Sequence, residues 1–382
     1  MKKYNFDQII DRRHAYSYKW DVKDNELSMW VADMDFAVLP EITEAIKNRL
    51  DVCAFGYTKV PDVYYEAYKN WWKKEYDVDI PLSAMTYCTG VVAAIDSIFK
   101  HILPKCSGVV VQTPVYHVFF NCVRNNGLTL LENQLLFKNN RYEIDFDNLE
   151  ELLKQENTKA LLLCNPHNPV GRIWSKEELN RIVTLCNKYS IILISDEIHC
   201  GIVDPNHKYN SIIEQSDNAI ALISPTKIFN VAGIQAACIV CKNKELLDKI
   251  ADGVGQDDVG EANYFSPFAT IAAFTFGEEW VKEMNEYVYQ NKQYVINYLK
   301  ENIPNLHIVN QEATYLLWLD ISSYTNNSDE FAKDLREKTG LFVSPGMQFG
   351  KGGESFLRIN IATSLANVKD ACERLKKYVK NA

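Results

Sequence analysis

The chain has 382 residues, of which 47% are hydrophobic and 45 are aromatic (7 Trp, 21 Tyr and 17 Phe), a composition that excludes a disordered chain and predicts a large core. Its 41 basic and 50 acidic residues give a net charge of −9 with no basic block, which argues against nucleic acid or an anionic membrane as a partner. The N-terminus lacks an apolar signal core and no apolar stretch reaches membrane-spanning length, so we expect a cytoplasmic protein.

The ten cysteines are expected to be reduced, because most lie in apolar surroundings of a chain without a secretion signal. Cys238 and Cys241 match a C-x-x-C pattern, but they lie inside a predicted strand. No second pair or nearby histidine completes a zinc tetrad. We therefore expect structural cysteines and no metal.

Short apolar strands alternate with amphipathic helices from Pro40 to Lys282. This alternation is typical of an α/β fold with a mostly parallel sheet covered by helices on both faces. A capping box formed by Ser175 and Glu178 predicts a helix that continues to about Lys188. The expected strands are Gly108–Gln112, Thr129–Leu135, Lys159–Cys164, Ile191–Ser195, Ala219–Ser224 and Ala236–Cys241.

The C-terminal part of the chain has a different pattern, which predicts a smaller α+β domain. We expect an N-terminal segment over residues 1–45 that packs with this small domain, a large domain over 46–282 and the small domain over 283–382. The expected elements of the C-terminal part are a helix over Glu278–Glu301, a strand over Tyr315–Ile321, a helix near Asp329–Lys338, a strand over Phe356–Ile361 and a final helix from about Ala366.

Three of the predicted strands are followed by polar residues. Asn168 lies in a turn between two prolines, Asp196 comes at the end of an apolar strand, and Lys227 follows another. The carboxyl ends of parallel strands share one edge, where ligands of open α/β folds bind. A carboxamide, a carboxylate and a lysine are what pyridoxal 5′-phosphate (PLP) requires, because they bond its phenolic oxygen, keep its ring nitrogen protonated and bind its aldehyde as a Schiff base.

Each of these residues has an ordinary structural interpretation when taken alone. Lys227 would be a solvated loop cation, Asp196 a helix cap and Asn168 part of an Asn-Pro turn. The co-occurrence of the three favours the cofactor site.

The order of the motifs resembles that of known enzymes. Asn168-Pro169-x-Gly171, Asp196-Glu197, Ser224-x-x-Lys227 and Phe356–Asn360 resemble the aminotransferase-fold (fold type I) PLP enzymes. Three further segments resemble the carbon–sulfur β-lyases of the MalY/PatB type, namely Trp30–Phe36, Ser195–His199 and Thr314–Asp320. The resemblance runs from about Trp30 to the final helix, and it implies a mostly parallel seven-stranded sheet sandwiched by helices.

The resemblance also implies roles for individual residues. Lys227 would bind the cofactor and remove the Cα proton of the substrate, and the Tyr116 ring would stack on the pyridine, although a core tyrosine is the alternative. Arg358, in an apolar strand where an unpaired guanidinium is costly, would bind the substrate α-carboxylate. The alternative for Arg358 is an internal salt bridge.

The phosphate of the cofactor needs amide and hydroxyl donors. The helix that opens after Gly90 offers N-terminal amides to an anion, and the resemblance assigns the amides of Val91 and Val92 and the hydroxyl of Ser224. Tyr57 matches a tyrosine that reaches the phosphate from the other subunit, which implies a homodimer.

Two positions depart from the aminotransferase pattern. Gln235 stands where many aminotransferases place a phosphate-binding arginine, which weighs mildly against a typical transaminase. His199 stands where that branch usually carries a tyrosine, and it could be a site residue or a satisfied core histidine.

These features predict a PLP-dependent β-lyase that cleaves an L-cysteine S-conjugate, with cystathionine as the leading substrate, to a thiol, pyruvate and ammonia. An aminotransferase on the same scaffold is the alternative, because it would use the same lysine, aspartate and arginine. A regulatory protein that binds a partner is a third possibility.

Overall fold

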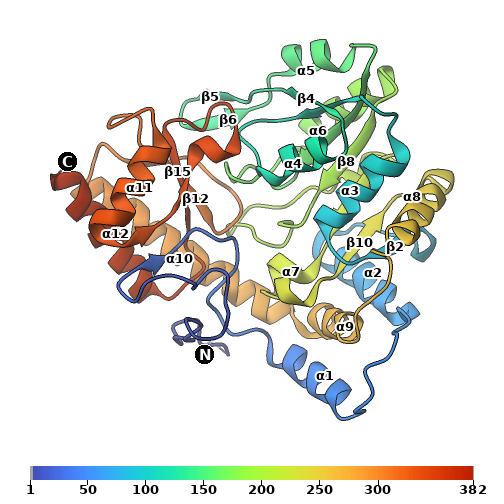
Figure 1. Cartoon of the computed structure of the whole chain (residues 1–382), viewed down its shortest axis with the longest axis horizontal. Coiled ribbons are helices and arrows are strands. Elements are labelled where there is room, and N and C mark those ends of the chain that lie inside the picture. The colour runs from blue at the N-terminus through green and yellow to red at the C-terminus, as the bar shows by residue number, and fades with distance from the viewer. Residues whose placement is uncertain (1–2, 382) are drawn as a thin grey trace.

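The computed structural model describes residues 3–381, and its larger part, to the right in Figure 1, is built around a seven-stranded sheet. Only β10 runs antiparallel to its neighbours, so the mostly parallel sheet predicted from the sequence is confirmed. In spatial order the strands are β2 (Met85–Cys88), β10 (Ala237–Val240), β9 (Ile220–Ile223), β8 (Ile192–Asp196), β7 (Thr158–Cys164), β3 (Gly108–Val111) and β4 (Thr129–Glu132).

Alternate side chains of these strands enter two apolar clusters, one on each face of the sheet. In β7, for example, Leu162 belongs to one cluster and Leu161 and Leu163 to the other, as the two-residue period of a strand requires. Helices α3 (Val91–Ile102), α4 (Val118–Asn125) and α8 (Lys244–Gln256) cover one face. Helices α2 (Asp62–Tyr76), α5 (Phe146–Leu153), α6 (Lys176–Lys188) and α9 (Ser266–Phe276) cover the other.

Helix α6 begins at the capping box that the sequence predicts. The Ser175 hydroxyl accepts from the Glu178 amide at 3.1 Å, and the Glu178 carboxylate accepts from the Ser175 amide at 2.7 Å. Both hydrogen bonds satisfy backbone N–H donors at the start of the helix that have no partner within the helix.

The C-terminal part has its own antiparallel sheet. Helices α10 (Glu278–Asn302), α11 (Ser328–Thr339) and α12 (Leu365–Asn381) pack beside it, and the three are grouped around the strands in Figure 1. Its strand order is β11 (His307–Ile308), β12 (Leu316–Asp320), β15 (Phe356–Asn360) and β14 (Ser344–Pro345). The predicted helices and strands of this region are thereby confirmed to within a few residues.

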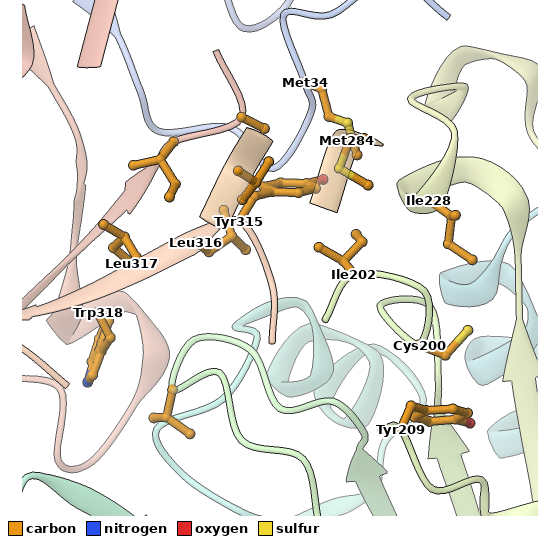
Figure 2. Packing of buried hydrophobic residues seen from close by; sticks show 14 of the residues in the cluster. Met34, Cys200, Ile202, Tyr209, Ile228, Met284, Tyr315, Leu316, Leu317 and Trp318 are labelled. Atoms are coloured by element: carbon orange, nitrogen blue, oxygen red, sulfur yellow. The ribbon is translucent and has the colours of Figure 1, made fainter. Parts of the chain in front are cut away.

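The N-terminal segment contacts both the C-terminal part and the helices of the larger part. Its strand β1 (Leu27–Ser28) pairs in parallel with β13 (Leu341–Phe342), whereas α1 (Pro40–Leu50) packs on α9. The larger apolar cluster joins this segment to the other parts, because fully buried Met34, Met284, Tyr315 and Trp318 all belong to it (Figure 2). No helix among residues 3–381 is long and apolar enough to cross a membrane.

Several elements were absent from the sequence-based prediction, among them strand β2 and the hairpin of β5 (Leu136–Lys138) and β6 (Arg141–Glu143). Strand β2 is short and reads Met-Thr-Tyr-Cys, so its apolar pattern is weak. The hairpin turns at Asn139 and Asn140. Both asparagines have positive φ, of 50° and 59°, and such a pair is the usual signal for a tight hairpin turn.

Gly171 fixes the turn that carries Asn168. Its φ is 66°, and a Cβ there would lie 2.5 Å from Gln311 Nε2 and 2.8 Å from the Ala313 carbonyl oxygen. We expect Gly171→Ala to lower the free energy of unfolding by about 2–4 kcal/mol, because a left-handed backbone and a steric clash are combined. Urea denaturation checks this, with Gly56→Ala as a control, since a Cβ at Gly56 meets nothing within 4 Å; equal stability of the two variants would contradict it.

Candidate active site

The carboxyl ends of β7, β8 and β9 meet at one edge of the large sheet. Cys164, the last residue of β7, lies opposite Asp196, the last residue of β8. A cavity of about 310 Å³ opens at this edge. Six of the nine predicted site residues line it, namely Val91, Val92, Tyr116, Asn168, Asp196 and Lys227.

Lys227 lies in α7 (Pro225–Ile228), a single helical turn directly after β9. Its ammonium group donates to the Ala32 carbonyl at 2.6 Å. Burial lowers the pKa of Lys227 to about 8, and Arg358 adds to this, whereas the charges of Asp33 and Asp196 oppose it. The amine is therefore neutral in a substantial fraction of molecules near pH 8, and a neutral amine can accept a proton or attack a carbonyl carbon.

The lowered pKa of Lys227 predicts a pH-dependent stability in the cofactor-free chain. Between pH 8 and 10.5 the unfolded chain, with the ordinary lysine pKa of 10.5, binds a proton that the native amine has lost. The free energy of unfolding therefore rises with pH over this range. Below pH 8 the native state carries a buried ammonium charge, which destabilises it. We expect Lys227→Met to be more stable than the parent at pH 7, with a difference that shrinks at pH 10.

Urea denaturation of both proteins at the two pH values measures this difference. The other titrating groups are shared, so their effects cancel in the comparison except at Asp196 and His199, whose pKa values the Lys227 charge lowers. A difference that is equal at pH 7 and pH 10 would show that the Lys227 pKa is not lowered in the native state.

Asp196 is a buried carboxylate, with 5% of its surface exposed. Burial raises its pKa to about 7, against the hydrogen bond that Oδ1 accepts from the Ile198 amide at 3.0 Å and against the charge of Lys227. A carboxylate in this setting is stabilised by a cation placed in the cavity. A protonated ring nitrogen is such a cation.

Arg358 lies in β15, reaches the site from the small sheet and is 4% exposed. Its Nη1 donates to Asn168 Oδ1 at 3.0 Å and its Nη2 to the Trp30 carbonyl at 2.9 Å, while Nε has no partner in the described chain. The guanidinium also lies 4.7 Å from the centre of the Phe349 ring.

Arg358 forms no ion pair with any carboxylate that the structure describes, so the alternative of an internal salt bridge is wrong. Burial lowers its pKa to about 10, which leaves it charged at neutral pH. A buried guanidinium without a carboxylate partner fits an anionic ligand.

The segment after Trp30 forms one wall of the site through its carbonyl groups. The Tyr315 hydroxyl donates to the Ala32 carbonyl at 3.1 Å, the same oxygen that Lys227 contacts. The Asn360 amide donates to the Val31 and Asp33 carbonyls, each at 2.6 Å. The small sheet therefore fixes this segment beside Lys227.

The end of the cavity at the N-terminus of α3 is lined by donors without charge. Thr89, Thr226 and Gln235 line the cavity, whereas Ser224 does not. The sequence prediction missed the two threonines and noted Gln235 only as a departure from the aminotransferase pattern. The Ser224 hydroxyl instead caps α7 and donates to the Ala236 carbonyl at 2.7 Å. Thr226 Oγ1 lies 2.6 Å from this hydroxyl, so the serine orients the threonine. The sequence feature that could have indicated Thr226 as a site residue is its hydroxyl two positions after Ser224.

Tyr57 lies away from the cavity of its own chain. Its side chain is fully exposed and follows exposed Phe55 in an irregular segment before α2. This position leaves it available to another molecule.

Glu197, beside Asp196, is held inside the protein rather than at the cavity. Its carboxylate accepts from Ser211 Oγ at 2.8 Å, from Ser195 Oγ at 3.0 Å and from the Ile212 amide at 2.9 Å, and also from the Tyr209 hydroxyl. These bonds give Glu197 a structural role.

Comparisons with known proteins match nearly the whole chain. The family model for aminotransferase class I and II covers residues 27–375. The cystathionine beta-lyase PatB of Bacillus subtilis is 35% identical over 97% of this chain and 99% of its own length. Among solved structures, cystalysin of Treponema denticola, which contains pyridoxal 5′-phosphate, has a TM-score of 0.94 at 31% identity and covers 99% of both chains.

A PLP-bound C-S lyase of Staphylococcus hominis complexed with L-cycloserine is also similar. Its TM-score is 0.93 at 33% identity, with 99% of this chain and 98% of the lyase covered. Sequence and structure thus lead to the same group of proteins.

Proposed function

The chain belongs to the aminotransferase class I and II family, and from that premise we propose that it is a PLP-dependent carbon–sulfur β-lyase. It cleaves L-cystathionine or related L-cysteine S-conjugates to a thiol (homocysteine from cystathionine), pyruvate and ammonia. Near full-length similarity to PatB and to the C-S lyase of S. hominis supports this function. The observation that carries it is the convergence of Lys227, Asp196 and Arg358 on one buried site.

The residues at the cavity fit the cofactor. The buried carboxylate of Asp196 needs a cationic partner, and Asn168, whose Oδ1 is taken by Arg358, retains its amide N–H groups as donors. The α3 amides of Val91 and Val92 suit the phosphate. When bound, PLP supplies an aldehyde that links to an amine and a protonated ring that withdraws electrons from Cα.

The protein residues orient the substrate and move its proton. Arg358 binds the α-carboxylate through its charged donors. Lys227, with a pKa of about 8, accepts the Cα proton, since a base is most effective when its pKa lies near the working pH. Asp196 would hold the ring nitrogen of the cofactor through its ionised carboxylate. After loss of the Cα proton the Cβ–S bond would break, the sulfur would leave as a thiol once it takes up a proton, and water would hydrolyse the remaining three-carbon fragment to pyruvate and ammonia.

The remaining assignments concern assembly and location. Full exposure of Tyr57 supports a homodimer in which this tyrosine reaches the phosphate in the other subunit. The pairing of β1 with β13 supports an N-terminal segment over 1–45 that packs with a small domain over 283–382, beside a large domain over 46–282. The composition supports a cytoplasmic site of action.

An aminotransferase would use the same lysine, aspartate and arginine, so product analysis is the decisive test. We expect the PLP-loaded enzyme to release thiol and pyruvate in equal amounts from cystathionine without any added 2-oxo acid. Amino transfer to an added 2-oxo acid without release of thiol would overturn the lyase assignment. The same assay on cystine, cysteine and S-methylcysteine ranks the S-conjugates.

A further inference from the structure

The buried hydroxyl of Tyr315 makes a single hydrogen bond in the described chain. It donates to the Ala32 carbonyl oxygen at 3.1 Å, and no part of the tyrosine is exposed. A buried phenol needs a partner for its hydroxyl, whereas phenylalanine would fill the same core position without one. Because the partner is a backbone oxygen that Lys227 also contacts, the hydroxyl serves the site and not the core around the ring.

The backbone that carries Tyr315 is held in an unusual conformation. Thr314, directly before it, has a φ of 71°, a region that β-branched residues rarely adopt. Contacts with the larger part of the molecule hold it there: the Thr314 amide donates to the Ile202 carbonyl at 2.8 Å, and Ala313 forms a bridge with Val203. Such conformations persist where surrounding contacts impose them, and they cluster at functional sites. The turn therefore fixes the position of the tyrosine at a conformational cost.

The Ala32 oxygen has two donors, Tyr315 and Lys227. The lysine Nζ lies 2.6 Å from this oxygen. A carbonyl oxygen has two lone pairs, so the hydroxyl and the amine together fill its capacity. The Asn360 side chain holds the carbonyls of the two neighbouring residues, so the shared oxygen is fixed from both sides.

The contact with Ala32 suits an amine that is free for only part of a reaction cycle. When the nitrogen of Lys227 is joined to the aldehyde carbon of PLP, it loses both hydrogens of the neutral amine. The free amine can donate one N–H to the carbonyl and keep its lone pair for a proton. We propose that the Ala32 carbonyl is the docking point of the free Lys227 amine, and that Tyr315 is the positioning residue that holds this oxygen and shares it. The inference rests on the proposed linkage of PLP to Lys227 and not on which reaction follows.

Ionisable side chains from several elements act on the Lys227 amine or are acted on by its charge: Asp33, Asp196, His199 and Arg358. Burial lowers the pKa of Lys227 to about 8, and Arg358 acts in the same direction, whereas the two carboxylates oppose it. Asp33 is itself paired with Arg12 at 3.2 Å and with Lys19 at 3.7 Å. His199, whose Nδ1 has no partner in the described chain, stays neutral because burial lowers its pKa to about 3.

Tyr315 adds an effect that does not depend on these charges. A carbonyl oxygen favours the ammonium form of Lys227, because an ionised donor makes the stronger hydrogen bond. The hydroxyl takes one of the two lone pairs and directs its positive hydrogen to the oxygen that the nitrogen contacts, which opposes the ammonium form. Removing the hydroxyl should therefore raise the pKa of Lys227 and leave a smaller neutral fraction near pH 8.

Tyr315→Phe tests the docking point without an assay of turnover. The full-length chain is mixed with PLP at a series of pH values, the linkage is trapped with sodium borohydride after a fixed short time, and the labelled Lys227 peptide is quantified by mass spectrometry. Because the neutral amine is the form that attacks the aldehyde, the initial rate of labelling follows the neutral fraction. We expect the pH midpoint of this rate to rise by about 0.5–1 unit in Tyr315→Phe.

Tyr64→Phe is the matched control, because Tyr64 is also fully buried and its hydroxyl donates to the Ala237 carbonyl at 3.1 Å, outside the cavity. It should keep the parent midpoint, even if both variants lose some stability. An unchanged midpoint in Tyr315→Phe, or an equal shift in Tyr64→Phe, would overturn this inference alone. A parent chain in which PLP never labels Lys227 would instead refute the proposed linkage, and the docking point with it.

Discussion

Replacing Lys227 by alanine is expected to lower kcat/KM for cystathionine by at least about 10³-fold, because one side chain provides both the amine that links to PLP and the base that accepts the Cα proton. No other lysine lines the cavity of the described chain. With PLP bound, the Asp196 carboxylate would pair with the ring nitrogen and would not be available as a substitute base. Thiol release at saturating PLP measures the loss.

Lys208→Ala is the matched control, since this lysine is exposed and lies outside the cavity. It should retain the parent activity. Near-parental activity in Lys227→Ala, with the chain folded and PLP present, would remove the lysine from the mechanism and leave the proposed chemistry without a base.

Replacing Arg358 by leucine is expected to lower kcat/KM about 10²- to 10³-fold, mainly through a higher KM, because the charged donors that bind the α-carboxylate are lost. Arg358→Lys should lie between the parent and the leucine variant, since an ammonium keeps the charge but not the planar pair of donors. Steady-state kinetics over a range of cystathionine concentrations separates KM from kcat.

A substrate change distinguishes lost recognition from a general disturbance of the site. The α-carboxamide of the same S-conjugate has no carboxylate charge, so Arg358→Leu should reduce its turnover far less than it reduces that of the acid. Equal losses on both substrates would mean that Arg358 acts by holding Asn168 and the Trp30 carbonyl in place and does not recognise the carboxylate.

The arrangement of strands could be predicted from the sequence because buried parallel strands are short apolar runs with clear ends. The runs that became β7, β8 and β9 end in Cys164, Asp196 and Ile223, so the sequence also placed Asn168 and Lys227 near a common edge. The start of α6 could also be predicted, because its capping box is formed by residues that are close together in the sequence. These features depend on neighbours in the chain.

Features that depend on distant contacts could not be predicted. The sequence does not show that the Ala236 carbonyl, just before β10, accepts the Ser224 hydroxyl, nor that Thr226 lines the cavity. The contact of Lys227 with the Ala32 carbonyl joins positions 195 residues apart. The missing partners of His199 are likewise visible only in the folded chain.

Covalent mapping of the cofactor tests the central claim most directly. The PLP-loaded enzyme is reduced with sodium borohydride, digested and sequenced by mass spectrometry. The peptide that contains Lys227 should carry one pyridoxyl phosphate group, and Lys227→Ala should yield no labelled peptide. A label on a different lysine, or none on an enzyme that still releases thiol from cystathionine, would contradict the assignment of this lysine as the residue around which the site is built.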